Sequence, residues 1–141
     1  MNKFLLSCVA FAVLASTAIA QLPKKKAPEG ASVYFLSPKD GETVSSPVTV
    51  RFGLKGMGVA PAGIDQPNTG HHHLLVDMPK DPDFDAALPV TDNIRHFGAG
   101  QTETELKLPP GKHTLQLVFG DSLHIPHDKP IVSPKITITV K

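Results

Sequence analysis

Polar and apolar residues alternate along several short stretches of this chain, as they do in strands that bury one face. The clearest stretch is residues 47–55, in which Val48, Val50, Phe52 and Leu54 alternate with smaller or more polar side chains. The same period, or a run of β-branched and aromatic residues, predicts further strands at residues 32–36, 71–77, 88–94, 102–108, 113–119 and 135–140. No long stretch has the period of an amphipathic helix, so the pattern indicates a chain built from strands.

Turn residues separate the predicted strands at fairly regular intervals. The sequence has 14 prolines and 11 glycines, which gather in segments such as Pro38–Gly41 and Pro109–Gly111. Short strands divided in this way are typical of two antiparallel sheets packed face to face. We therefore predict an all-β fold, an immunoglobulin-like antiparallel β-sandwich of about seven strands, with a small barrel as the alternative.

The first twenty residues have the composition of a secretory signal peptide. A positive start that includes Lys3 precedes an almost wholly apolar run over residues 4–19, and Ala18-Ile19-Ala20 fits a cleavage site. We predict that residues 1–20 are removed during export, which makes the protein periplasmic or secreted. A membrane anchor is the alternative, but the apolar run is short for one. Residues 21–31 are charged and contain proline, which predicts a flexible linker, and residues 32–141 form the folded domain.

The composition of the exported chain excludes two classes of partner. Loss of Lys3 with the signal leaves 13 basic and 13 acidic residues, so there is no general attraction to nucleic acid. The same balance argues against stable attachment to a membrane once the signal is removed. The one cysteine, Cys8, also lies in the signal, so no disulfide forms and stability has to come from a packed core.

Histidine is the most informative residue type in the chain. Three of the seven histidines are adjacent, His71, His72 and His73, and they begin a predicted strand that continues with an apolar run. Side chains at positions i and i+2 of a strand point the same way, so His71 and His73 form a ready pair of metal ligands. The same alternation predicts that His72 points inward with Leu74.

The order of the strands predicts that other histidines join this pair. Alternate loops of such a sandwich lie at the same end, and strands 71–77 and 113–119 are expected to be neighbours. The candidate metal ligands at that end are His71, His72, His73, His96, His124, His127 and Met57. Imidazole nitrogens suit copper or zinc, and a thioether from Met57 would favour copper, which we place before zinc. Imidazoles of ordinary pKa would lose the metal below about pH 6.

Two other interpretations of the histidines stay open. They can form a structural polar cluster, or the same loops can bind a protein or a glycan without metal. His113 begins its strand at the opposite end, and its phase predicts a core-edge side chain that hydrogen-bonds a carbonyl group. The acidic loop from Asp81 to Asp92 departs from the calcium-binding pattern at two key positions and is expected to be solvated. The sequence contains no nucleophile or zinc-protease motif, so an enzyme is not the favoured class.

Several motifs carry a resemblance to a known family. They are Gly70-His71-His72-His73-Leu74-Leu75 and the segments 38–41, 56–63, 110–115 and 120–124. Over roughly residues 45–140 the chain resembles domain-of-unknown-function family 4399, whose members are small exported bacterial proteins. The resemblance implies export but no activity, so the metal hypothesis depends on the histidines. We predict an exported protein for storage or delivery of copper or zinc, or for protection from them, with a metal donor or acceptor protein as its partner.

Overall fold

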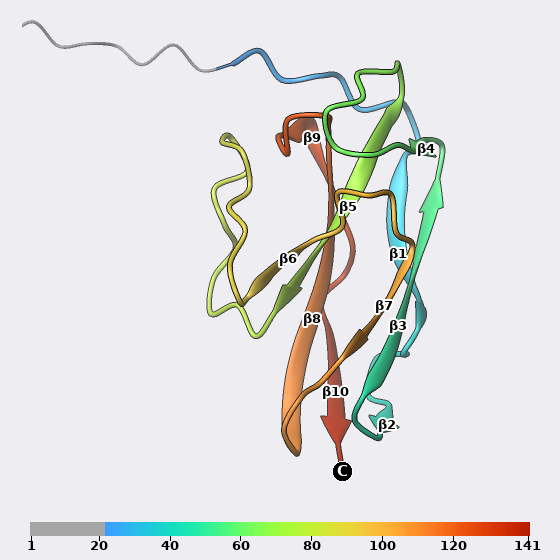
Figure 1. The fold of residues 1–141 in the computed structure, drawn as a ribbon, viewed down its shortest axis with the longest axis vertical. Helices are drawn as coiled ribbons and strands as arrows, with labels where there is room; N and C mark the ends of the chain where they lie inside the picture. The colour runs from blue at the N-terminus through green and yellow to red at the C-terminus, as the bar shows by residue number, and fades with distance from the viewer. Residues whose placement is uncertain (1–21) are drawn as a thin grey trace, which may run out of the picture.

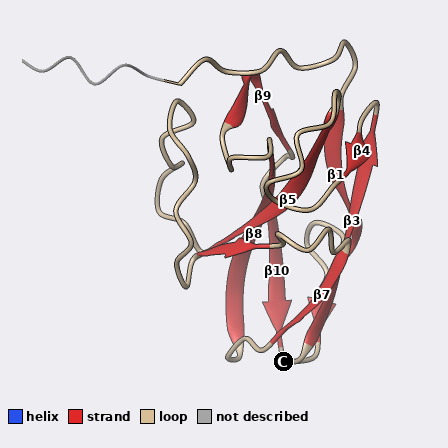
Figure 2. Cartoon of the chain, turned by 45° about the horizontal axis from the view of Figure 1, so that its top comes forward, coloured by secondary structure: helices blue, strands red, loops and turns tan. Residues whose placement is uncertain are grey.

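The structure is a computed structural model that describes residues 22–141, and these residues form strands joined by loops, with no helix among them (Figure 2). One sheet has the order β1-β3-β7, formed by Ser32–Ser37, Val48–Lys55 and Glu103–Leu106. The other has the order β2-β10-β8-β5-β4, formed by Thr43–Val44, Ile136–Val140, Gly111–Gly120, Thr69–Val76 and Gly58–Val59. Two further strands join this second sheet: β6 (Ile94–His96) pairs with β5, and β9 (Pro126–Val132) pairs with β8.

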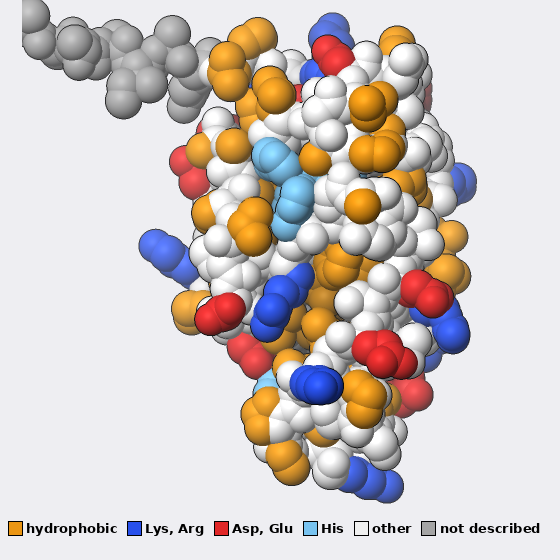
Figure 3. Space-filling view, viewed as in Figure 1, with side chains coloured by type: hydrophobic (Ala, Val, Ile, Leu, Met, Phe, Trp, Pro, Cys, Tyr) orange, Lys and Arg blue, Asp and Glu red, His pale blue; other side chains and the backbone are white. Residues whose placement is uncertain are grey.

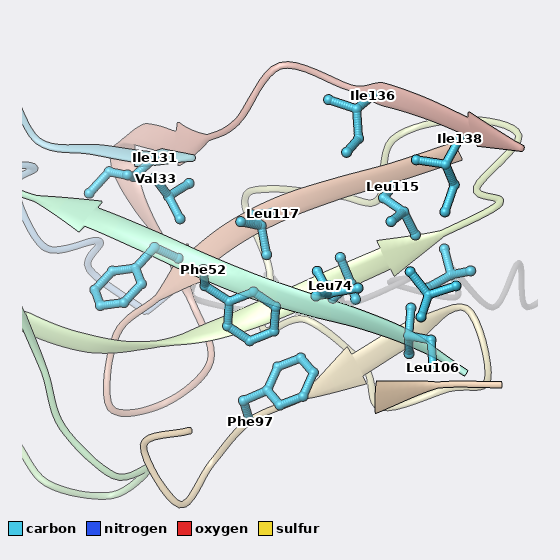
Figure 4. Close-up of a cluster of buried hydrophobic side chains, with 14 of the residues drawn as sticks. Val33, Phe52, Leu74, Phe97, Leu106, Leu115, Leu117, Ile131, Ile136 and Ile138 are labelled. Atoms are coloured by element: carbon cyan, nitrogen blue, oxygen red, sulfur yellow. The ribbon is translucent and has the colours of Figure 1, made fainter. Parts of the chain in front are cut away.

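The two sheets pack face to face, which confirms the predicted immunoglobulin-like sandwich (Figure 1). The main core lies between them. Phe52 points into it from β3, and Leu74 and Leu117 point into it from β5 and β8 (Figure 4). Val50 on β3 and Phe119 on β8 belong to the same core. All five side chains are at most 4% exposed. Burial of each such side chain stabilises the fold by roughly 1.5–3 kcal/mol, and the alternation of residues along the strands is what brings them together.

The register between β5 and β8 positions the histidines. The two strands are antiparallel, and His71 lies opposite Gly120 while Val76 lies opposite Leu115. The start of β5 is therefore beside the end of β8, as predicted. The outer face of β5 is also covered, because Leu75 packs with Leu88, Ile94 and Val118 in a second, smaller core.

Two stretches differ from the predicted secondary structure. Residues 88–93 contain no strand, and β6 begins only at Ile94, because Thr91 accepts hydrogen bonds through its hydroxyl from the backbone of Asn93 (3.3 Å) and of Ile94 (3.0 Å) and so forms a turn. Residues 126–132 were expected to belong to a loop but form β9. Prolines and charged residues interrupt the alternation there, and only pairing with β8 reveals the strand.

Residues 22–31 lie along the domain. Lys24 donates hydrogen bonds to the carbonyl of Phe84 (2.9 Å) and the carboxylate of Asp85 (2.8 Å), and the amide of Ala27 donates to Asp128 Oδ1 (2.9 Å). The predicted signal peptide, residues 1–20, lies outside the described residues. Within the described part of the chain, no helix has the length and hydrophobicity to cross a membrane.

His113 lies at the end of the sandwich where β8 begins. Its Nε2 is 2.8 Å from the carbonyl of Pro109, and its Nδ1 is 2.7 Å from Asp77 Oδ2. The carbonyl bond confirms the prediction for this residue. Both partners are acceptors, so both ring nitrogens donate, and the hydrogen bond that His113 donates to Asp77 raises the pKa of His113.

Candidate metal centre

The three adjacent histidines divide between the two faces of β5. His72 points into the main core, where its ring centroid lies 5.1 Å from that of Phe52 and 5.0 Å from that of Phe119. His71 and His73 point to the opposite face, with ring centroids 4.8 Å apart. This is the division that strand alternation predicts, and all three side chains are fully buried.

Two more histidines come to His71 and His73 from other elements. Strand β6 pairs with β5 so that His96 lies opposite His73, and His124 follows the end of β8. Each of the four residues offers a ring nitrogen, and these atoms all lie within 4.8 Å of one another. The Nε2 of His71 is 3.0 Å from Nδ1 of His124 and 3.1 Å from Nε2 of His96. We call these four residues the histidine cluster.

Two glycines, which have no side chain, make room for the histidine rings of the cluster. A Cβ atom added at Gly120 would lie 2.9 Å from Cε1 of His73 and 3.3 Å from the backbone of His124. One added at Gly98 would lie 2.2 Å from Cε1 of His96. Real Cβ atoms do not approach other heavy atoms so closely, so these two positions require glycine if the rings are to converge as they do.

A hydrogen-bonded turn presents His124. Oδ1 of Asp121 accepts hydrogen bonds from the amides of Leu123 (2.8 Å) and Ile125 (3.0 Å), and the amide of His124 donates to the Asp121 carbonyl (3.0 Å). His124 itself has φ = 65°, a left-handed conformation that is uncommon for residues other than glycine. The backbone of this turn therefore sets the position of the His124 ring.

Burial favours the neutral form of three cluster histidines, His71, His73 and His96. Desolvation, followed by the neighbouring His124 and His96, lowers the pKa of His71 to about 4. Desolvation, followed by the other cluster histidines, lowers the pKa of His73 to about 3, and the pKa of His96 is lowered by the same two causes. Neutral imidazole is the form that binds metal ions, so His71 and His73 stay ready to bind below the pH 6 limit expected from the sequence.

The cluster has both unpaired nitrogens and an opening to the surface. Among the described residues, Nδ1 of His71 and both ring nitrogens of His73 are buried without a hydrogen-bond partner. His96 and His124 are partly exposed, and histidine side chains reach the surface on the face shown in Figure 3. Buried polar atoms without partners are costly, and a metal ion that enters from this face would provide a partner for one ring nitrogen of His73.

The structure places the other three candidate residues apart from the cluster. His72 lies on the core face of β5, and Met57 packs against the edge of the main core. His127 is buried in β9 and is not among the four residues whose nitrogens converge. The sequence reasoning did not single out Asp121, and its only signal was its place directly after the strand that ends at Gly120.

Comparisons with known proteins give a family but no activity. No curated protein matches the chain. Among solved structures, the chain is similar to the endo-beta-1,4-mannanase from Thermotoga petrophila, with 21% sequence identity and a TM-score of 0.46. That match covers 79% of this chain but 20% of the mannanase, so the chain spans only a small part of that enzyme. A family model matches residues 50–141, and the chain belongs to this family, described as Domain of unknown function (DUF4399).

Proposed function

We propose that this protein binds a transition-metal ion, copper or zinc, through His71, His73, His96 and His124. The observation that carries the proposal is the convergence of four imidazole nitrogens within 4.8 Å in a partly buried site. Four ligands of this kind suit the coordination of zinc and copper, whose bonds to imidazole nitrogen are about 2.0–2.1 Å long. Modest ring movements would bring all four nitrogens to that distance from one ion.

The ligand set also limits what the centre does. All four ligands are neutral nitrogens, and the two on β5 are fully buried. Catalytic zinc sites usually keep one position for water, whereas four protein ligands close the coordination sphere. The arrangement therefore favours holding an ion over catalysis. We propose storage, delivery or protection in the periplasm or outside the cell, with a protein that donates or accepts the metal as the partner.

A metal-free interaction module is the second candidate. A cleft of about 670 Å³ borders His96, and its floor includes Phe97 and Leu106. Its size is within the range of small-molecule sites. A glycan site would need an exposed aromatic surface for stacking, but Phe97 is only 8% exposed, and Tyr34, the one tyrosine, lies on β1 in the other sheet. The cleft thus has room for a ligand but indicates no ligand class, whereas the histidine cluster has the nitrogen ligands that a transition metal requires.

Calorimetric titration of the purified protein with Cu²⁺, Cu⁺ and Zn²⁺ tests the metal proposal. We expect one ion per chain for the preferred metal. The double substitution His71→Ala and His73→Ala removes both ligands on β5 and should abolish this binding. His72→Leu is the matched control, because residue 72 lies on the same strand but points to the other face. Binding that survives the double substitution would show that the cluster is not the site, and metal analysis of protein purified from its own host would identify the ion.

A further inference from the structure

A buried acidic side chain lies beside the histidine cluster. Asp121 is 2% exposed, and within residues 22–141 no ion pair involves it. Among the described residues, its carboxylate accepts hydrogen bonds only from the backbone amides of Leu123 and Ile125. A buried carboxylate without an ion-pair partner is unfavourable, so a positive ion bound nearby would stabilise it.

The position of Asp121 connects it to the cluster in two ways. It follows Gly120, the residue that leaves space for the ring of His73, and it begins the turn that carries His124. Its charge also acts on His71, where it favours the protonated ring and so opposes the larger effect of burial on the pKa. It forms no salt bridge within 4.0 Å of a histidine nitrogen and is not a member of the four-residue group. Asp121 thus lies outside the ligand set but close enough to influence a charge within it.

We propose that Asp121 is the positioning residue and the counter-charge of the metal centre: it fixes the turn that presents His124, and its carboxylate balances the charge of the ion held by the four neutral histidines. This inference rests on the proposed metal-binding function. Residues behind the ligands commonly orient them and tune the bound metal in this way. Four histidine ligands supply no negative charge, and Asp121 is a buried acidic residue whose charge acts on His71 of the cluster.

The counter-charge role makes a quantitative prediction. Coulomb energy is proportional to the charge of the ion, so loss of one negative charge weakens binding of a divalent ion by twice the free energy lost for a monovalent ion. A single nearby charge changes the affinity of an ionisable group for a proton by roughly tenfold or more. We therefore expect Asp121→Asn to weaken Ag⁺ binding by about tenfold and Zn²⁺ binding by about a hundredfold.

The test compares the affinities of the full protein for Zn²⁺ and Ag⁺, two ions that do not change oxidation state during the measurement. Asp121→Asn and Asp121→Ser both keep an oxygen that can accept the amide hydrogen bonds of the turn, so one variant can replace the other if it folds poorly. Asp128→Asn is the matched control, since Asp128 also accepts two backbone amides through Oδ1 but is exposed. Its affinities for both ions should equal those of the wild type.

The outcomes separate this inference from the proposed function. If the wild type binds neither ion, the metal-binding function itself fails. If the wild type binds both ions but the Asp121 variants bind them unchanged, the function stands and the role of Asp121 is wrong. Equal losses for Zn²⁺ and Ag⁺ would show that Asp121 only holds the turn, which overturns the counter-charge. A loss for Zn²⁺ whose logarithm is about twice that for Ag⁺ supports the full proposal.

Discussion

Replacement of His72 by leucine should stabilise the protein. The ring of His72 is fully buried between Phe52 and Phe119, and within residues 22–141 neither of its nitrogens has a hydrogen-bond partner. A buried polar group left without partners costs roughly 1–3 kcal/mol. Leucine has a similar volume and no polar atoms, so part of this cost should be recovered. We expect the free energy of unfolding to rise by about 1–2 kcal/mol at pH 7.5.

The gain from this substitution should grow in acid. Burial lowers the pKa of His72 to about 4, whereas the ring has its ordinary pKa of 6.5 in the unfolded chain. Below pH 6.5 the unfolded chain takes up a proton that the folded protein does not, so stability falls as the pH falls from 6.5 towards 4. At pH 5.5 this single group removes about 1.4 kcal/mol from the wild type and nothing from the leucine variant.

Urea unfolding of metal-free wild type and His72→Leu at pH 7.5 and pH 5.5 measures both effects. The variant should have the higher midpoint at both values, and the difference in unfolding free energy should widen by about 1.3 kcal/mol at the lower pH. A variant that is less stable at pH 7.5 would show that His72 has favourable interactions in the core. A difference that stays constant with pH would show that His72 is not held neutral in the folded protein.

Three further predictions concern other parts of the domain. Because burial lowers the pKa of His71 and His73 to about 4 and about 3, Zn²⁺ titrated calorimetrically at pH 5.5 should still bind at a single site, and complete loss of binding between pH 7 and pH 6 would contradict the burial argument. Gly120→Ala should weaken Zn²⁺ binding at least about tenfold because its Cβ would meet the ring of His73, whereas Gly58→Ala, whose Cβ would make only an ordinary contact at 3.4 Å, should not. His113→Gln should lower the unfolding free energy by about 1–3 kcal/mol at pH 6, because a raised pKa gives stability that is present below pH 6.5 and is lost as the pH rises through the folded value. Urea unfolding at pH 6 and pH 9 checks this, and an equal loss at both would rule out a charged ring.

Local alternation was enough to predict most of the fold. At residues 48–55 and 113–119 the apolar positions recur every second residue, and the structure has β3 and β8 there. The alternation also predicted that His71 and His73 share a face while His72 points to the core, because this depends only on strand geometry. Strands 71–77 and 113–119 were predicted to be adjacent in one sheet from their order along the chain of a sandwich. The pairing of β5 with β8 confirms this prediction.

Contacts that depend on the paths of irregular segments could not be predicted from the sequence. The pairing that places His96 opposite His73 depends on how the chain from 77 to 93 returns to β5, and no local pattern specifies that path. His127 was expected in a loop with His124, but pairing with β8 draws it into β9. Asp121 lacked any signal of its own, since an acidic residue after a strand is common and its burial appears only in three dimensions.

The wide spacing of the histidine cluster along the chain has a consequence for when an ion can be captured. His71 and His124 are 53 positions apart, and the sheet must close before their rings meet. Of the four cluster rings, a nascent or unfolded chain holds only His71 and His73 near each other in the sequence. An ion that needs all four nitrogens therefore binds only the folded domain. Its binding free energy then adds to the free energy of unfolding.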